Sequence, residues 1–151
     1  MPILLDLCCG GGGAAVGYAR AGFDVVGVDN VPQSRYPFEF HCADALQFAR
    51  KYGGDFDVIH ASPPCQKWSR AAKQWRKKGY RYPNLIASLR TVIRDRVAVY
   101  VIENVEDALL IEPIMLCGAM FGLRVYRHRF FECSFDIEAP RHREHKWTQC
   151  K

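Results

Sequence analysis

The chain has 151 residues, of which 49% are hydrophobic and 25% are charged, and its formal net charge at pH 7 is +5. This composition excludes an intrinsically disordered chain, and the length suits one compact domain over residues 1–151. The apolar runs fall far short of the ~20 residues that cross a bilayer, and the N-terminus has no signal-peptide pattern, so we expect a soluble, cytoplasmic protein with no membrane partner.

The first elements predict a βαβ unit. Residues 3–7 form an apolar run around Asp6, typical of a buried strand, and four glycines, Gly10–Gly13, follow before a helix expected over 14–21. A second strand over 24–28 ends at Asp29. Because such a unit needs ~30 residues, the two strands are expected to pair in parallel.

The rest of the chain continues the alternation. We expect a strand over 38–42, a helix from Asp44 to 51, a strand over 56–61, a helix over 84–94 and a central strand over 97–102. An antiparallel pair is expected over 123–126 and 130–135. Strands that alternate with helices predict an α/β domain with a mostly parallel sheet, here with a C-terminal antiparallel strand pair.

The polar residues and special turns follow the predicted strands, at the edge where such sheets bind ligands. The glycine turn lets the backbone approach a ligand such as NAD, FAD or S-adenosylmethionine, or it is only a tight turn. Asp29 could accept hydrogen bonds from ribose hydroxyls or be a solvated or capping aspartate. Asp44 could bind an adenine amine or cap its helix.

Two candidate catalytic residues follow neighbouring strands. Cys65 lies just beyond two prolines and before a basic stretch, where positive charge favours the nucleophilic thiolate; the alternative is a small buried cysteine. Glu103 closes the apolar strand over 97–102, where burial would let the carboxyl group share a proton with a bound base. Parallel strands that end at one edge would bring both side chains to one cleft.

The segment Lys67–Arg81 holds seven basic residues and no acid, so it carries +7 and the rest of the chain −2. Trp68, Trp75 and Tyr80 interrupt the charges. Basic side chains neutralise phosphates and aromatic rings stack on bases, so the segment predicts a nucleic-acid contact rather than a solvated helix face. Arg127 and Arg129 form a second basic pair, or ordinary surface charge.

A metal site is a further possibility, formed by Cys133, His142, His145 and Cys150. The eight, two and four residues between them do not match the common zinc arrangements. The sequence therefore predicts no metal site.

Taken together, and in chain order over about residues 3–135, these segments resemble the catalytic domain of the DNA cytosine-5 methyltransferases, in a short form like that of phages. Residues 6–13 resemble the motif Asp-Leu-Phe-x-Gly-x-Gly-Gly with Cys8 in place of phenylalanine, and Asp29 stands where the family usually has a glutamate. Residues 63–66 resemble Pro-Pro-Cys-Gln, residues 103–105 match Glu-Asn-Val, and Arg127-x-Arg129 is similar to Gln-x-Arg-x-Arg with Val125 at the glutamine position.

The resemblance implies a Rossmann-like S-adenosylmethionine-dependent methyltransferase fold and transfer of a methyl group from S-adenosyl-L-methionine to C5 of a flipped cytosine. Cys65 would add to C6, Glu103 would bind N3 and the amino group, and Arg127 or Arg129 would hold O2 or a phosphate. The implied cofactor-binding residues are Asp6, Leu7, Cys8, Gly10, Gly12, Asp29, Asn30, Asp44, Ala45 and Pro63. The implied nucleic-acid-binding residues are Gln66, Lys67, Ser69, Arg70, Lys73, Arg76, Lys77 and Lys78.

The resemblance also implies a DNA substrate, double-stranded rather than single-stranded, and a mobile loop over 67–81. The family's target-recognition segment and last cofactor motif find no match here, so we expect low sequence specificity, with self-association or a partner chain supplying the missing elements. Three alternatives stay open: a non-catalytic remnant that binds nucleic acid or cofactor, a methyltransferase of RNA or single-stranded DNA, and a nicotinamide-dependent oxidoreductase suggested by the glycine turn alone.

Overall fold

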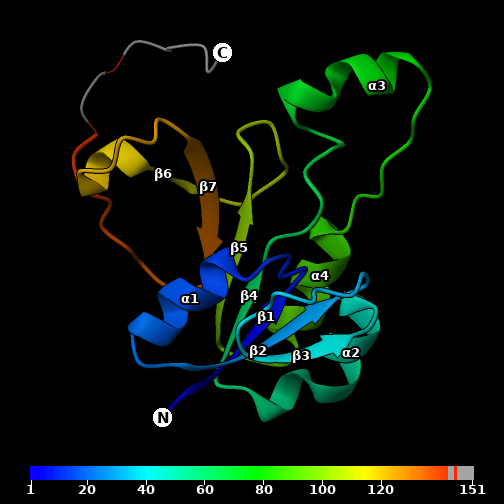
Figure 1. The fold of residues 1–151 in the computed structure, drawn as a ribbon, viewed down its shortest axis with the longest axis vertical. Coiled ribbons are helices and arrows are strands. Elements are labelled where there is room, and N and C mark those ends of the chain that lie inside the picture. The colour runs from blue at the N-terminus through cyan, green and yellow to red at the C-terminus, as the bar shows by residue number, and fades with distance from the viewer. Residues whose placement is uncertain (143–144, 146–151) are drawn as a thin grey trace.

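The computed structural model describes residues 1–142 and 145, and its seven strands there form one sheet in the order β3-β2-β1-β4-β5-β7-β6 (Figure 1). The strands are β1 (Ile3–Leu7), β2 (Asp24–Asp29), β3 (Glu39–Cys42), β4 (Val58–Ala61), β5 (Val99–Asn104), β6 (Ile114–Cys117) and β7 (His128–Cys133). The α-helices are α1 (Gly13–Arg20), α2 (Ala45–Tyr52), α3 (Lys73–Lys77) and α4 (Ile86–Arg94). Short 3-10 turns lie at η1 (Gly53–Asp55), η2 (Arg70–Ala72) and η3 (Gly118–Phe121).

The strand directions confirm the predicted fold. Strands β1 to β5 pair in parallel, and β7 runs antiparallel to both of its neighbours, β5 and β6. The chain therefore has the Rossmann-like methyltransferase fold, a mostly parallel sheet that ends in an antiparallel pair. β5 lies inside the sheet between β4 and β7, as its apolar sequence predicted.

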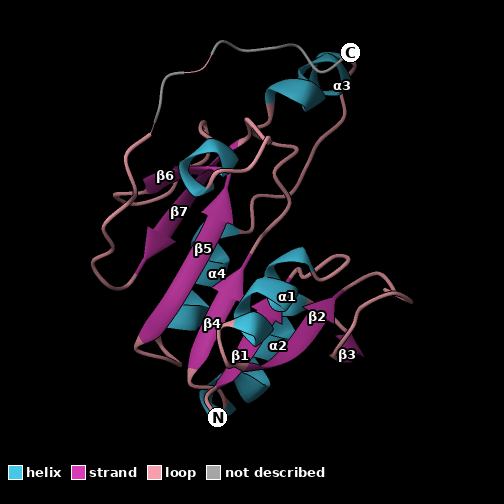
Figure 2. Ribbon diagram, turned by 60° about the vertical axis from the view of Figure 1, so that its left-hand side comes forward, coloured by secondary structure: helices cyan, strands magenta, loops and turns pink. Residues whose placement is uncertain are grey.

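Helices cover both faces of the sheet, α1 on one side and α2 with α4 on the other (Figure 2). Successive residues of β1 point to opposite faces, so Leu5 and Leu7 pack under α2 and α4 while Leu4 packs with Ala15 of α1. Each such buried leucine contributes ~1.5–3 kcal/mol. In the part of the chain that is described, no helix has the length and apolar character needed to cross a membrane.

One predicted strand is wrong. Residues 123–126 form no strand, and β7 pairs instead with β6, which the sequence pattern did not predict. The alternation of apolar residues over 123–126 predicts a strand with one buried face, but Leu123 and Val125 are 58% and 54% exposed and pack against no core among the described residues. The backbone turns at Gly122 (φ +71°) and then passes Gly118 so closely that a Cβ there would lie 2.4 Å from the Val125 carbonyl oxygen.

Candidate active site and cofactor pocket

The predicted site residues gather where β1, β2, β4 and β5 end. Leu7 pairs with Val28 on one side and with Ala61 on the other, and Ala61 pairs with Ile102. The residues that follow these four strands therefore share one edge of the sheet, at the top of Figure 1. Asp29 and Glu103 lie within the last residues of their strands, β2 and β5, rather than just beyond them.

The glycine turn after β1 needs unusual backbone angles. Gly10 and Gly12 have φ values of +50° and +84°, and Cys8 has a φ of +58° although it carries a side chain. A Cβ at Gly12 would lie 2.8 Å from the Pro37 side chain, whereas at Gly10 it would meet no atom within 4 Å. The turn thus packs against the protein at Gly12 and stays open toward a ligand at Gly10.

Asp29 fixes this turn. Its Oδ2 accepts a hydrogen bond from the Gly10 amide at 3.0 Å and its Oδ1 accepts one from the Val31 amide at 3.0 Å. Each carboxylate oxygen has a second lone pair, so Asp29 can still accept from a ligand. Asp44 caps α2, because its Oδ1 accepts a hydrogen bond from the Gln47 amide at 2.8 Å.

A cavity of about 250 Å³ lies beside the turn and collects half of the predicted cofactor residues. Its lining residues are Cys8, Asp29, Asn30, Asp44, Ala45, Ser62, Pro64, Gln66 and Leu85. Leu7 lies in the hydrophobic core, and Pro64 rather than Pro63 faces the cavity. The cavity joins the glycine turn to the residues on either side of Cys65.

Asp6 lies on the α1 face of the sheet and is fully buried. Neither of its carboxyl oxygens has a hydrogen-bond partner of regular geometry in the described part of the chain. Burial raises the pKa of Asp6 to about 7; the nearby Tyr36 hydroxyl opposes this shift and Asp29 adds to it. A buried carboxyl group left without a partner points to a cationic or hydrogen-bonding ligand.

These observations fit S-adenosylmethionine. The molecule offers ribose hydroxyls and an adenine amine as donors and carries positive sulfonium and ammonium groups. Two carboxyl groups, Asp29 and Asp44, line the cavity, and Asp6 is buried nearby in β1 without lining it. Burial and the neighbouring aspartates raise the pKa of both Cys8 and Cys9 to about 12, so these two cysteines stay thiols.

Cys65 lies on a turn that several hydrogen bonds hold. Its carbonyl oxygen accepts from the amides of Trp68 and Ser69 at 2.9 and 2.8 Å. The buried side chain of Asn104 donates from Nδ2 to the carbonyl oxygen of Pro63 at 2.9 Å. The Glu-Asn-Val motif at the end of β5 therefore anchors the Pro-Pro-Cys turn at the end of β4.

Glu103 forms an ion pair with Arg129, with 2.8 Å between Oε1 and Nε. Burial raises the pKa of Glu103, while Arg129, a hydrogen bond from Ser62 and the charge of Arg127 lower it in part. Between the two arginines, the structure therefore selects Arg129 as the direct partner of Glu103.

A buried polar chain behind Glu103 was missed at the level of sequence. The Nε2 atom of His60 is 2.8 Å from the Ser62 hydroxyl, and its Nδ1 is 3.0 Å from the Tyr18 hydroxyl. Burial lowers the pKa of His60 to about 4, so the ring is neutral near pH 7. Only the alternation of β4 could have placed His60 and Ser62 on one face.

Three of the four predicted catalytic residues, Cys65, Arg127 and Arg129, line a second cavity of about 300 Å³. Ser69 and Arg70 from the basic segment line it as well. Glu103 is not among the lining residues but contacts Arg129, which is. The cavity is therefore bounded by the turn that carries Cys65, the start of β7 and the basic segment.

The basic segment divides into two kinds of residues. Arg70 forms ion pairs with Glu106 (3.0 Å) and Asp107 (3.9 Å), and Arg76 donates to the carbonyl oxygens of Gln66 (2.6 Å) and Ser69 (2.8 Å). These contacts shape the segment. Arg70 is nevertheless exposed, as are Gln66, Lys67, Lys73, Lys77, Lys78 and Arg81, which form no ion pair among the described residues. In Figure 1, α3 stands out beyond the sheet edge that carries the site.

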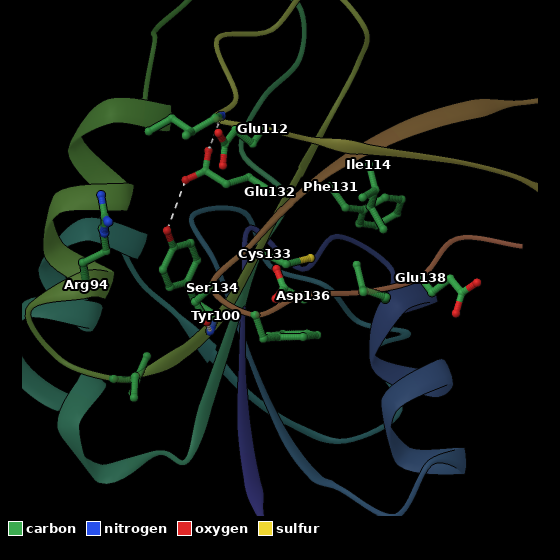
Figure 3. A pocket seen from close by; sticks show the side chains of 15 residues that line it. Arg94, Tyr100, Glu112, Ile114, Phe131, Glu132, Cys133, Ser134, Asp136 and Glu138 are labelled. Atoms are coloured by element: carbon green, nitrogen blue, oxygen red, sulfur yellow. Dashed lines mark hydrogen bonds between the residues drawn. The ribbon is translucent and has the colours of Figure 1, made fainter.

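A third cavity lies elsewhere. It has a volume of about 1040 Å³ and is lined by the early part of β5 and the last residues of β7, at the opposite end of β5 from Glu103 (Figure 3). Tyr100 and Glu132 lie on its wall and share a hydrogen bond of 3.3 Å. No candidate catalytic residue lines it.

The metal-ligand set considered from sequence is wrong where it can be examined. His142 and His145 do lie together, but their neighbours are Cys117 and His128 rather than Cys133. Cys150 lies outside the described residues.

Comparison with known proteins gives a family match. A family model described as C-5 cytosine-specific DNA methylase matches residues 3–112. An uncharacterized methyltransferase of Synechocystis sp. is 41% identical over 70 residues, covering 39% of this chain and 31% of that protein. A putative ribosomal RNA large subunit methyltransferase of Methanocaldococcus jannaschii is 33% identical over 98 residues, covering 54% and 26%. The match thus spans less than a third of either curated relative.

Among solved structures, a conserved hypothetical protein of Streptococcus pyogenes has a TM-score of 0.55 at 17% identity, covering 95% of this chain and 91% of that chain. A hypothetical protein of Thermus thermophilus also has a TM-score of 0.55, at 18% identity, covering 86% and 72%. At these identities the likeness supports the fold alone.

Proposed function

The chain belongs to the C-5 cytosine-specific DNA methylase family, and from that membership we propose that it methylates C5 of cytosine in DNA through a covalent adduct with Cys65. The observation that carries the proposal is the joining of two motifs. Asn104 donates to the Pro63 carbonyl oxygen at 2.9 Å, which ties the end of β5, with Glu103, to the turn that holds Cys65.

The pocket beside the glycine turn would hold S-adenosyl-L-methionine. Asp29 and Asp44 would accept hydrogen bonds from the ribose and the adenine amine, and Asp6 would balance positive charge. The cofactor supplies a methyl group bonded to a positively charged sulfur. Because the same cavity is lined by Ser62, Pro64 and Gln66, a cofactor bound there would lie next to the turn that carries Cys65.

Cys65 would form a bond from its sulfur to C6 of the base, which pushes the C5–C6 electron pair toward C5. C5 then takes the methyl group and loses its proton to a base, and the sulfur–C6 bond breaks as the double bond returns. Glu103 would bind N3 and the exocyclic amine, supplying a proton at N3 as negative charge builds in the ring.

Arg129 would keep Glu103 in place and reach the base oxygen O2, while Arg127 in the same cavity would bind a phosphate. This division follows from the ion pair that Arg129 alone forms with Glu103 among the described residues. Lys67, Lys73, Lys77, Lys78 and Arg81 would neutralise phosphates, and Trp75 and Tyr80, which are 43% and 58% exposed, would contact bases.

A mechanism-based trap tests this proposal. Full-length protein is incubated with S-adenosylmethionine and duplex DNA in which 5-fluorocytosine replaces cytosine. Because fluorine cannot leave C5 as a proton does, the adduct with Cys65 persists and migrates as a protein–DNA complex on a denaturing gel. We expect the wild-type chain to form the adduct and Cys65→Ser to lose it, with methyl transfer reduced by ~10³-fold or more.

Cys42→Ser is the matched control, since Cys42 is exposed on β3 outside both cavities. It should form the adduct like the wild type. If wild-type protein binds S-adenosylhomocysteine but gives neither adduct nor methyl transfer, the proposal fails and a non-catalytic remnant is favoured. Binding of NAD in place of S-adenosylhomocysteine would favour an oxidoreductase.

RNA is a second candidate substrate, favoured by the named function of one relative, a putative ribosomal RNA methyltransferase. The same cysteine chemistry would serve either nucleic acid. Methyl transfer to duplex DNA, single-stranded DNA and RNA of matched sequence separates the candidates by their kcat/KM values.

A further inference from the structure

Four side chains from three segments meet at the end of β6. Cys117 closes β6, His128 opens β7 as its pairing partner, and His142 and His145 lie in the chain that follows β7. One ligand atom from each lies within 4.8 Å of all the others. The Nε2 atom of His145 lies 3.1 Å from His142 Nε2, 3.3 Å from His128 Nε2 and 3.4 Å from Cys117 Sγ.

Hydrogen bonds alone do not account for this convergence. An imidazole nitrogen carries either one proton or one lone pair, so His145 Nε2 can satisfy one of its three close neighbours well and not all three. The other ring nitrogen of His145 is buried and has no hydrogen-bond partner among the described residues. Imidazole nitrogens and a sulfur that converge within 4.8 Å of one another are typical of ligands around a cation.

The distances agree with a tetrahedral zinc site. Zinc lies ~2.0–2.1 Å from histidine nitrogen and ~2.3 Å from cysteine sulfur, which places ligand atoms ~3.3 Å apart for two nitrogens and ~3.6 Å apart for nitrogen and sulfur. The measured N···N contacts of 3.1 and 3.3 Å and the S···N contact of 3.4 Å have nearly these lengths before any adjustment to an ion. Imidazole and thiolate donors suit Zn²⁺ rather than Mg²⁺ or Ca²⁺.

We propose that Cys117, His128, His142 and His145 bind one Zn²⁺ ion in a closed structural site. Four protein ligands leave no open position for water or substrate, which distinguishes structural zinc from catalytic zinc. The site is separate from the methyl-transfer chemistry proposed above and does not depend on it. It also differs from the expectation of no metal site, which rested on ligand spacing alone.

The ion would fasten the chain after β7 to the β6–β7 pair. His128 lies between Arg127 and Arg129, so the same ion would fix the start of β7, where Arg129 pairs with Glu103. Zinc binding would therefore stabilise the last part of the sheet and position an arginine of the active site. His128 and Arg129 also line the cavity that holds Cys65.

The test measures metal directly. Full-length protein, purified without chelator and with any polyhistidine tag removed, is analysed for metal by mass spectrometry, and its zinc is then replaced by Co²⁺. We expect one zinc per chain and, with Co²⁺, the visible absorption of a tetrahedral site with a thiolate ligand. Neither readout depends on methyltransferase activity.

His142→Gln and Cys117→Ser remove one ligand each, and His41→Gln and Cys42→Ser, both at exposed positions of β3, are the matched controls. Since loss of even an indirect metal contact costs ~10–100-fold in affinity, loss of a direct ligand should weaken zinc binding by ~100-fold or more. Cys117 is buried and its variant could misfold, whereas His142 is half-buried and outside the sheet.

Two results would overturn the proposal. One is wild-type protein that contains no zinc and gives no Co²⁺ spectrum, which would leave a metal-free histidine cluster. The other is a His142→Gln variant that binds zinc as tightly as His41→Gln does.

Discussion

At the scale of single residues, the buried carboxyl group of Asp6 makes the stability of the protein depend on pH. The carboxyl group is fully buried and its pKa is raised to about 7 from 3.8. Between these pH values the folded chain holds a proton that the unfolded chain releases. Stability from this group is therefore present at low pH and is lost as the pH rises toward 7.

Asp6→Asn should accordingly stabilise the cofactor-free protein at pH 8 and change little at pH 4. The shift sets an upper bound of about 4 kcal/mol on the gain, at about 1.36 kcal/mol per pH unit. Urea denaturation of both proteins at pH 4, 6 and 8 measures it. His60, with its pKa lowered to about 4 from 6.5, changes stability in the opposite sense over this range, but it is present in both proteins and cancels.

If Asp6 balances positive charge on the cofactor as proposed, the same variant should bind S-adenosylhomocysteine more weakly, which calorimetry would detect, because it loses that negative charge. A variant that is no more stable than the wild type at pH 8 would show that a partner already satisfies Asp6 in the cofactor-free protein. Asp24→Asn, at the start of β2 and the far end of that strand from the site, is the control and should leave cofactor binding unchanged.

Single residues also show how far the sequence predicts the site. Asp29, Cys65 and Glu103 could be placed because each follows or closes a recognisable strand, and parallel strands share an edge. The contacts of His60 with Tyr18 and of Arg129 with Glu103, by contrast, join segments that are far apart in the chain. No spacing in the sequence encodes those contacts.

At the scale of elements, α4 is joined to β7 by a buried ion pair. Arg90 donates from Nε and Nη2 to the two carboxylate oxygens of Glu132, each at 2.7 Å, and Glu132 also accepts from the Ile111 amide at 2.9 Å. Burial alone would raise the pKa of Glu132, but these hydrogen bonds lower it below its ordinary value. Figure 3 shows that the Glu132 carboxylate also accepts a hydrogen bond from the Tyr100 hydroxyl, on the wall of the cavity of about 1040 Å³.

Removal of one partner should leave a buried charge uncompensated. We expect Arg90→Met or Glu132→Leu to lower the free energy of unfolding by about 3–5 kcal/mol, and the double variant Arg90→Met with Glu132→Leu to lose less than the sum of the two single losses. Urea denaturation measures all of these. Arg70→Met breaks an exposed pair with Glu106 and should cost only about 0–1 kcal/mol. Equal losses in the two pairs would contradict this account.

Elements differ in how well the sequence predicts them. α2 begins with the capping residue Asp44, and β5, which contains Glu103, has a continuous apolar run. The sequence predicts the bounds of both elements to within a few residues. β6 has four residues between Pro113 and Gly118, too few for a periodic signal. Cys117, His128, His142 and His145 come from three segments of the chain. They can meet only once β6 has paired with β7, so ligand spacing in the sequence does not predict them.

At the scale of the whole molecule, charge is separated by position. The Lys67–Arg81 segment carries +7 and the remainder −2. Asp29 and Asp44 line the cavity of about 250 Å³ at the carboxyl edge of the sheet. In Figure 1, α3 projects from that same edge. Nucleic acid would be drawn to the projecting segment, while the positively charged cofactor would be drawn to the pocket behind it.

If the projecting segment contacts phosphates, affinity for nucleic acid must depend steeply on salt. Each phosphate contact to duplex DNA contributes about 0.9 to the slope of log K against log salt concentration. Replacing the exposed Lys73 and Lys77 with glutamine should therefore reduce the slope by about 2 and weaken binding to every sequence alike. Fluorescence anisotropy at several salt concentrations measures both effects.

The double variant Arg94→Gln with Arg96→Gln provides the matched loss of two charges, since both arginines are exposed and precede β5, at the opposite end of that strand from Glu103. It should leave the slope unchanged, because long-range charge is screened over ~10 Å at 0.1 M salt. Equal changes in the two variants would mean that net charge, rather than the Lys67–Arg81 segment, attracts the nucleic acid. Each phosphate contact contributes about 0.9 to the slope with duplex DNA and about 0.7 with single-stranded DNA. At the same number of contacts, one protein should therefore show a smaller slope with the single-stranded substrate.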